Sequence, residues 1–225
     1  MRKLVLPTGL SFIAGFVDTT GFLAISGLFT SHVTGNFVTL GVSLATGTQG
    51  VLAKLLMLPV FVFVVATMRV LIMALARRPP ETLLRLLLAI QAVLLTLFLC
   101  AGLAWGPFPD TDSVLAIVTG MLGVAAMAVQ NAGGRLILTH FPQTTVMTGN
   151  MTQWSLDLVD FLSPAGDAAG KRRFRLLTPL IAGFVLGCVT AALAFPPLHF
   201  WVLLLPLAIT LVLLAREPSE HDMPR

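Results

Sequence analysis

Residues 31–36 read SHVTGN and residues 144–150 read TTVMTGN, so the tripeptide TGN returns after 114 positions. Each stretch introduces a short segment with a helical pattern, 34–47 in the first half of the chain and 148–162 in the second. At about 1.5 Å per helical residue, segments of this length reach about 21 to 23 Å. The hydrocarbon core of a bilayer is about 30 Å thick, so neither segment is long enough to cross a membrane alone.

The composition of the whole chain indicates a polytopic membrane protein. Of its 225 residues, 56% are hydrophobic and only 11% are charged, and the mean hydropathy is +0.93. Soluble domains carry about 25% charged residues. Too few polar side chains remain to build a surface that faces water. This excludes a soluble enzyme and a nucleic-acid-binding domain, although the net charge is +4.

Six further apolar runs are each long enough to span a bilayer as a helix. They lie at residues 5–28, 51–76, 83–105, 113–136, 174–195 and 198–215. The two TGN-led segments either cross as well, giving eight crossings, or dip into the membrane and return on the same side. The distribution of basic residues separates these two topologies, because Lys and Arg gather in short cytoplasmic loops.

The charge map favours six crossings. With the TGN-led segments re-entrant, 12 of the 14 Lys and Arg residues lie on the cytoplasmic side. Eight crossings would instead place Arg77 and Arg78 outside, and would leave the loop 106–112, which has no basic residue, inside. We therefore predict six transmembrane helices plus two re-entrant half-helices, with both termini cytoplasmic.

Two more landmarks extend the TGN repeat over most of the chain. Asp18 matches Asn131 at a shift of 113, and Pro59 matches Pro179 at a shift of 120. Each unit then contains a span, a TGN-led half-helix and two more spans. Because three crossings is an odd number, the second unit is upside down relative to the first, as in many secondary transporters.

The predicted fold is thus an all-α integral membrane protein of two inverted repeats. We expect the first repeat at residues 1–108, the second at 109–216 and a polar cytoplasmic tail at 217–225. In such a repeat the two half-helices start from opposite faces, so their N-terminal ends, each with about half a positive charge, can meet near the midplane. The Thr hydroxyl can cap backbone N–H groups there, and Asn offers both donors and acceptors.

These considerations give a candidate set of residues for a substrate or ion pathway. The set is Asp18, Thr34, Gly35, Asn36, Gln130, Asn131, Thr148, Gly149 and Asn150. Asp18 lies about 13 residues into the first span, where a charge costs about 2.5 to 3.5 kcal/mol. Two interpretations of Asp18 stay open: a cation ligand or proton carrier, and a brace for the neighbouring TGN backbone. For Gln130 and Asn131, interhelical hydrogen bonding is expected of at least one.

Other residues have structural interpretations. We expect Arg69 to snorkel to the interface rather than pair with Asp18. The basic run at 171–175 is interpreted as a topology signal that touches anionic lipid and needs no specific partner. The GxxxG spacing of Gly183 and Gly187 predicts close helix packing.

Motifs of enzymes and metal sites are missing from the sequence. It contains no HExxH or GxSxG, and Ser26 followed by His32 resembles an intramembrane serine protease only loosely. Cys100 and Cys188 lie in apolar runs without CxxC spacing and are expected to be buried thiols. We therefore expect no enzymatic activity, no metal and no cofactor.

The two halves together resemble the YoaK-type family of uncharacterised small bacterial integral membrane proteins. The residues that carry the resemblance are Gly15, Asp18, Gly21, Phe29, Thr34, Gly35, Asn36 and Gly41, and Gln130, Asn131, Thr148, Gly149 and Asn150. The resemblance covers nearly the whole chain. It implies a multi-pass protein of the bacterial inner membrane and names no substrate.

The function expected from these observations is transport, through a carrier or a channel, of a small solute or ion. Its partners would be the lipid bilayer and that solute, with no nucleic acid, and a homo-oligomer is left open. The alternative is a membrane scaffold or assembly protein whose polar centre is purely structural. The sequence leaves the charge of the solute open, because helix N-termini favour anions whereas Asp18 favours cations or protons.

Overall fold

The computed structural model describes residues 4–216, and every regular element within that range is a helix. In chain order the helices are α1 (Val5–Ala24), α2 (Gly35–Thr46), α3 (Val51–Ala74), α4 (Pro80–Trp105), α5 (Val114–Leu136), α6 (Met147–Leu162), α7 (Ala168–Leu198) and α8 (Leu204–Ala215). A short 3₁₀ helix, His199–Leu203, joins α7 to α8. The six apolar runs and both TGN-led segments are therefore helical, as predicted. The predicted tail at 217–225 lies outside the described residues.

Local signals in the sequence set several helix boundaries. The Ser113 side chain accepts a hydrogen bond from the backbone N–H of Ala116 at the start of α5, and Asp167 caps α7 in the same way. Helix α2 ends at Gly47, which adopts the left-handed conformation with a φ of 67°. The first helix ends at Ala24, before the predicted limit, because the chain reverses through Ser26 and Gly27 at positive φ.

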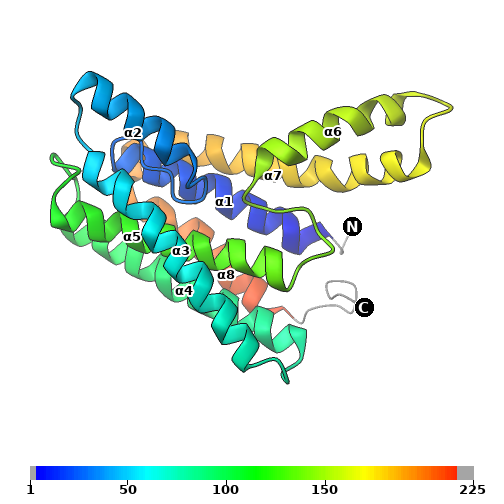
Figure 1. Ribbon diagram of the computed structural model, residues 1–225, viewed down its shortest axis with the longest axis horizontal. Coiled ribbons are helices and arrows are strands. Elements are labelled where there is room, and N and C mark those ends of the chain that lie inside the picture. Colours follow the sequence, from blue (N-terminus) through cyan, green and yellow to red (C-terminus); the bar gives the residue numbers. More distant parts are fainter. Residues whose placement is uncertain (1–3, 217–225) are drawn as a thin grey trace.

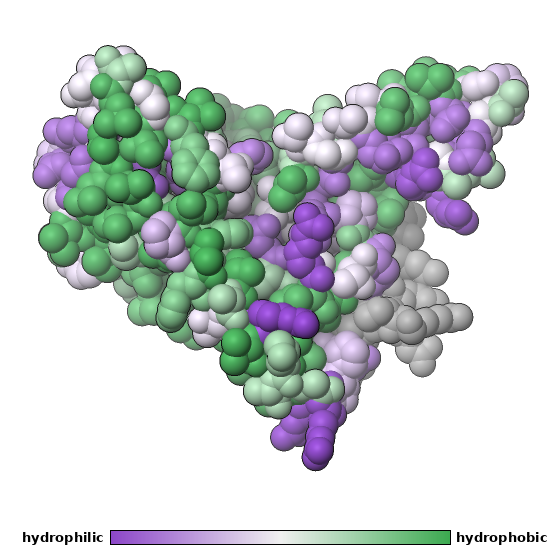
Figure 2. Space-filling view, in the orientation of Figure 1, coloured by the Kyte–Doolittle hydropathy of each residue, from purple (hydrophilic) through white to green (hydrophobic). Residues whose placement is uncertain are grey.

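The helices are those of a membrane-embedded protein. Within residues 4–216, four stretches are long and apolar enough to cross a membrane: α3, α4, α5 and the continuous stretch Ala168–Ala215 that holds α7 and α8. Few residues of α3 are buried although the helix is apolar on all sides, which is typical of a helix that faces lipid. Figure 2 shows hydrophobic residues spread over α2 and α3, with hydrophilic residues gathered on the α6–α7 arm and at the α3–α4 turn. The apolar helical class is thus as predicted.

The helices form a bundle from which α2 and α6 rise as two separate arms (Figure 1). The main contacts between α-helices are related by exchange of the two halves. Helix α1 packs on α7 as α5 packs on α3, α2 packs on α3 as α6 packs on α7, and α1 packs on α8 as α5 packs on α4. Exchanging α1 with α5, α2 with α6, α3 with α7 and α4 with α8 therefore reproduces this contact pattern.

Glycines allow the closest of these contacts, between α1 and α7. A Cβ atom added to Gly187 would collide with the backbone oxygen of Phe12, and one added to Gly15 would collide with that of Phe184. At Gly183 it would lie 2.9 Å from the backbone oxygen of Thr8. The predicted close packing at the GxxxG spacing is confirmed, and it brings the two backbones together without intervening side chains.

Each arm is tied to the following helix by a cation at an equivalent place. On the first arm, Lys54 Nζ of α3 donates to Ser43 Oγ of α2 at 2.7 Å. On the second arm, Arg173 of α7 forms an ion pair with Asp157 of α6, with Nη2 to Oδ1 at 2.8 Å. Ser43 and Asp157 are separated by the same 114 positions as the TGN tripeptides. The expectation that the run at 171–175 has no specific partner is therefore wrong for Arg173.

Two smaller expectations can also be compared with the structure. Cys100 is exposed on α4 and Cys188 is partly buried, so the prediction of two buried thiols is wrong for Cys100. An apolar lipid-facing surface explains why a sequence pattern alone misplaces it. Arg69 is exposed on α3, and within residues 4–216 its guanidinium forms no ion pair with Asp18.

Candidate functional site

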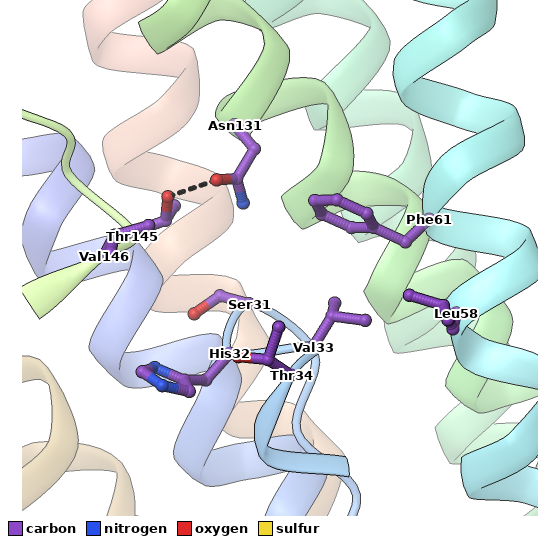
Figure 3. A pocket seen from close by; sticks show the side chains of 9 residues that line it. All are labelled: Ser31, His32, Val33, Thr34, Leu58, Phe61, Asn131, Thr145 and Val146. Carbon is purple, nitrogen blue, oxygen red and sulfur yellow. Dashed lines mark hydrogen bonds between the residues drawn. The ribbon is translucent and has the colours of Figure 1, made fainter. Parts of the chain in front are cut away.

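A cavity of about 150 Å³ lies where the two arms begin (Figure 3). Residues from four parts of the chain line it: the loop before α2, the middle of α3, α5, and the segment before α6. They are Ser31, His32, Val33, Thr34, Leu58, Phe61, Asn131, Thr145 and Val146. Since α2 starts at Gly35 and α6 at Met147, both half-helices begin at the edge of one cavity.

Ser31 contributes a hydroxyl that has no hydrogen-bond partner among the described residues. Its side chain is buried, with 5% of the residue exposed. In Figure 3 the hydroxyl lies between His32 and the segment that carries Thr145 and Val146. Buried polar atoms are nearly always paired, so an unpaired hydroxyl that lines a cavity is a candidate contact for a bound ligand.

Asp18 holds the loop that forms one wall of the cavity. Its Oδ1 accepts hydrogen bonds from the backbone N–H groups of Thr30 at 2.7 Å, Ser31 at 2.7 Å and His32 at 3.3 Å. Asp18 is buried in α1 and is not among the residues that line the cavity. Of the two interpretations that the sequence left open, these contacts fit a brace, but the backbone that Asp18 holds is that of Thr30 to His32, just before the TGN tripeptide.

Asn131 occupies the equivalent place in the second half, and it does line the cavity. Its Oδ1 accepts from the hydroxyl of Thr145 at 2.6 Å, and its Nδ2 donates to the backbone oxygen of Met127 at 3.1 Å. Thr145 is in turn the counterpart of Ser31 at the shift of 114. The two halves thus use the same position to hold the loop before the half-helix, through three backbone N–H groups in one half and one hydroxyl in the other.

The asparagines of the two TGN tripeptides also bind loop backbone. Asn36 Nδ2 donates to the backbone oxygen of Phe29 at 2.8 Å, and Asn36 Oδ1 accepts from the Phe29 N–H at 2.8 Å. Asn150 Nδ2 donates to the backbone oxygen of Gln143 at 2.7 Å. Both asparagines are buried, and neither is part of the cavity lining.

Gln130 connects three elements around the same region. Its Oε1 accepts from Gln91 Nε2 of α4 at 2.8 Å, and its Nε2 donates to the backbone oxygen of Leu10 at 2.8 Å and to Thr144 Oγ1 at 3.0 Å. The residue is buried and lies outside the cavity lining. The prediction of interhelical hydrogen bonding is therefore met by Gln130.

The threonines and glycines of the tripeptides differ between the halves. Thr34 precedes α2 and lines the cavity, but its hydroxyl caps no N–H, and Thr148 lies inside the first turn of α6. The expected Thr caps are therefore wrong, because Asn36 and its counterpart hold these turns instead. A Cβ at Gly35 would lie 2.8 Å from the Phe29 ring, whereas one at Gly149 would meet nothing within 4 Å.

Of the nine predicted site residues, the structure brings only Thr34 and Asn131 to the cavity wall. The other seven residues are not part of the cavity wall. Four of them form the side-chain hydrogen bonds to nearby segments described above: Asp18, Asn36, Gln130 and Asn150. Ser31 and Thr145 were missed as candidates, although their equivalent places in the repeat were a usable signal. His32 also lines this cavity. Across residues 4–216, His, Cys, Asp and Glu side chains nowhere form a group of three that could hold a metal ion.

The chain belongs to the family described as "Protein of unknown function (DUF1275)", whose model matches residues 6–215. No curated protein and no solved structure matches the chain. The resemblance noted in the sequence also implied an uncharacterised family, and the match agrees with this. The finer resemblance to the YoaK type stays a prediction.

Proposed function

We propose that this protein is a membrane transporter or channel for a small solute or ion, and that the cavity between the two arms is its binding site. One observation carries the proposal: residues at the starts of both TGN-led half-helices line one cavity, whose wall carries hydroxyl and amide side chains beside apolar ones. Backbone that leaves regular structure at membrane depth is tolerated where it lines such a cavity. Transporters built from repeats use discontinuous helices in this way.

The proposed topology has six crossings, two re-entrant half-helices in inverted repeats, and both termini in the cytoplasm of a bacterial inner membrane. Figure 1 supports it, since the start of α1, the end of α8 and the α3–α4 and α6–α7 turns lie toward one end of the bundle. Each half-helix runs from the middle of the bundle toward an end, α2 to one and α6 to the other. The pairing of contacts between the two halves agrees with a twofold relation.

Cysteine labelling tests the topology. In a chain with Cys100→Ala and Cys188→Ala, we would introduce Asp110→Cys in the α4–α5 loop or Ala169→Cys at the start of α7. A membrane-impermeant maleimide added to intact cells should label position 110 and not position 169. Labelling at 169, or none at 110 in a chain that labels after lysis, contradicts the topology.

Flux through proteoliposomes tests the transport function. The purified protein would be reconstituted, and uptake of chloride, nitrate, formate, potassium, glycerol and urea compared with that of protein-free vesicles. The expected result is protein-dependent flux of at least one of these solutes. Phe61→Trp should reduce that flux, because it adds volume to the wall of a cavity of about 150 Å³. Val62→Trp, on the exposed side of the same helix, is the matched control.

A scaffold or assembly role is the alternative, and one observation favours it. Asp18, Asn36, Asn150 and Gln130 are all used in hydrogen bonds within the protein. A centre of this kind could serve only to hold the helices together. If no solute crosses in the presence of folded, monodisperse protein, the scaffold alternative is preferred.

A further inference from the structure

We infer that the cavity between the arms binds a small anion with a single charge, an inference that rests on the transport function proposed above and names its substrate class. The sequence left the sign of the charge open. Four features of the cavity decide it: the start of α6, the hydroxyl of Ser31, the placement of Asp18 and the apolar part of the wall.

The first feature is the N-terminus of α6, which has no side-chain cap. The helix begins at Met147. The residue at its cap position is Val146, whose side chain cannot accept a hydrogen bond from the N–H groups of the first turn. The first N–H groups of a helix have no partner within the helix and carry about half a positive charge. In α2 the corresponding N–H groups of Gly35, Asn36 and Phe37 already bind carbonyl oxygens three residues back. The free donors are therefore expected on the α6 side, where Val146 lines the cavity.

The second feature is independent of the helix end. Ser31 lines the same cavity, and only 5% of the residue is exposed. Its Oγ has no hydrogen-bond partner among the described residues. It comes from the opposite arm, so a ligand between the two would contact both halves of the protein. A hydroxyl donor facing a helix N-terminus is the donor set that suits an anion.

The third feature removes the main argument for a cation. The Asp18 carboxylate lies behind the loop, with Oδ1 bound to the backbone of Thr30, Ser31 and His32. Asp and Glu are absent from the nine residues that line the cavity, and His32 is the one titratable side chain among them. A cation in the cavity would thus meet the positive start of α6 and no lining carboxylate.

The fourth feature limits the charge of the ligand. Val33, Leu58, Phe61 and Val146 form the apolar part of the wall. Removing an ion from water is costly, and the cost rises steeply with charge. A small anion with one charge, such as nitrate or formate, therefore fits this wall better than sulfate or phosphate.

Two measurements test the inference. The first is flux of nitrate, formate and sulfate into proteoliposomes, alongside potassium, glycerol and urea. The second is the thermal stability of the detergent-solubilised protein in nitrate against gluconate at equal ionic strength. We expect flux of nitrate or formate without flux of sulfate, and a higher Tm in nitrate.

Ser31→Ala is the diagnostic variant, and Ser11→Ala is its matched control. Ser11 is also a buried serine with an unpaired Oγ among the described residues, but it does not line the cavity. Ser31→Ala should lower anion flux about tenfold and abolish the Tm shift, since a hydrogen bond to a charged group is lost. It should leave the Tm in gluconate unchanged, because the removed hydroxyl has no protein partner. Ser11→Ala should change neither readout. Should Ser31→Ala fold poorly, Phe61→Trp tests the same cavity from another wall.

The outcomes separate the two proposals. Flux of potassium or glycerol without anion flux overturns the anion inference and leaves transport standing. No flux of any solute, with a Tm shift in nitrate that depends on Ser31, overturns transport and supports the anion site. Anion flux that is equal in wild type, Ser31→Ala and Phe61→Trp overturns the assignment of this cavity.

Discussion

Asn36 and Asn150 occupy equivalent positions in the two halves of the chain, and each holds the backbone of the residue seven positions before it. In both halves the amide nitrogen donates to a carbonyl oxygen, that of Phe29 or that of Gln143. The loop before each half-helix is thereby fixed onto the first turn of that helix. This arrangement explains why Asn stands at both places, since its amide nitrogen reaches the loop carbonyl in each half. In the first half Asn36 Oδ1 also accepts from the Phe29 N–H.

Asn36→Asp and Asn150→Asp are each expected to destabilise the protein. The substitution replaces the donor by an oxygen that faces the carbonyl of Phe29 or Gln143, and an unmatched buried polar group costs about 1 to 3 kcal/mol. Thermal unfolding in detergent measures the effect. Asn131→Asp is the contrast and should cost less, because Asn131 is only partly buried and the Met127 oxygen to which its Nδ2 donates lies inside α5, where the helix already supplies a backbone N–H. Two well-folded variants with altered flux would instead place both amides in the pathway.

Asp18→Ala should destabilise the protein more than Asp18→Asn. Alanine leaves the N–H groups of Thr30 and Ser31 without an acceptor, whereas the Asn side chain keeps one oxygen for them. Unfolding temperature and solute flux would be measured for both variants. If Asp18→Asn folds like the wild type but loses all flux, the carboxylate has a role in transport beyond the brace.

Gly187→Ala is expected to weaken the contact between α1 and α7. The added methyl group would collide with the backbone oxygen of Phe12, and overpacking of this kind costs about 1 to 3 kcal/mol. Gly41→Ala is the matched control, because a Cβ at that helical position meets nothing within 4 Å. The control should be neutral or slightly stabilising, since Ala is favoured over Gly in a helix. Equal Tm values for the two variants would show that the helices can separate without cost.

Asp112 gives a pH dependence that can be measured outside the membrane. Its carboxylate accepts from the backbone N–H groups of Gly50 at 2.9 Å and Ala53 at 3.0 Å, and so caps α3 from the α4–α5 loop. Burial acts to raise the pKa of Asp112, but these N–H groups together lower it below its ordinary value of 3.8. A lowered pKa stabilises the fold above the ordinary value, and this contribution is lost as the pH falls through the lowered pKa.

Wild type should therefore exceed Asp112→Asn in Tm at pH 7, by an amount that corresponds to the loss of a helix cap, about 0.5 to 2 kcal/mol. The difference should shrink as the pH falls below about 4, where the carboxyl of the unfolded chain takes up a proton, and should vanish below the lowered pKa, where the native carboxyl is neutral as well. Thermal unfolding in detergent from pH 7 to pH 2.5 measures it. A difference that stays constant over this range contradicts a role for the charge.

The sequence by itself determined the apolar, all-helical class of the protein and the positions of its helices, and it predicts the repeat. Apolar runs near the length of a bilayer predict helices because hydropathy and length are local properties, and the bounds of α3, α4 and α5 agree with them closely. The doubled TGN and its fixed shift identified α2 and α6 as equivalent, and Gly183 and Gly187 predicted the close contact with α1. Each of these signals lies within one segment or in the comparison of two.

Only the tertiary structure decided which polar groups bind one another and which remain free. Asp18 binds loop backbone, Gln130 joins three elements, and Asp157 pairs with Arg173, and none of these partners follows from the spacing along the chain. Hydrogen-bond partners depend on the relative placement, to within about an ångström, of segments that pack together only in the folded chain. For the same reason Ser31 looks like any other serine in the sequence. Only the fold places its hydroxyl, unpaired among the described residues, in the wall of the cavity where the two arms begin.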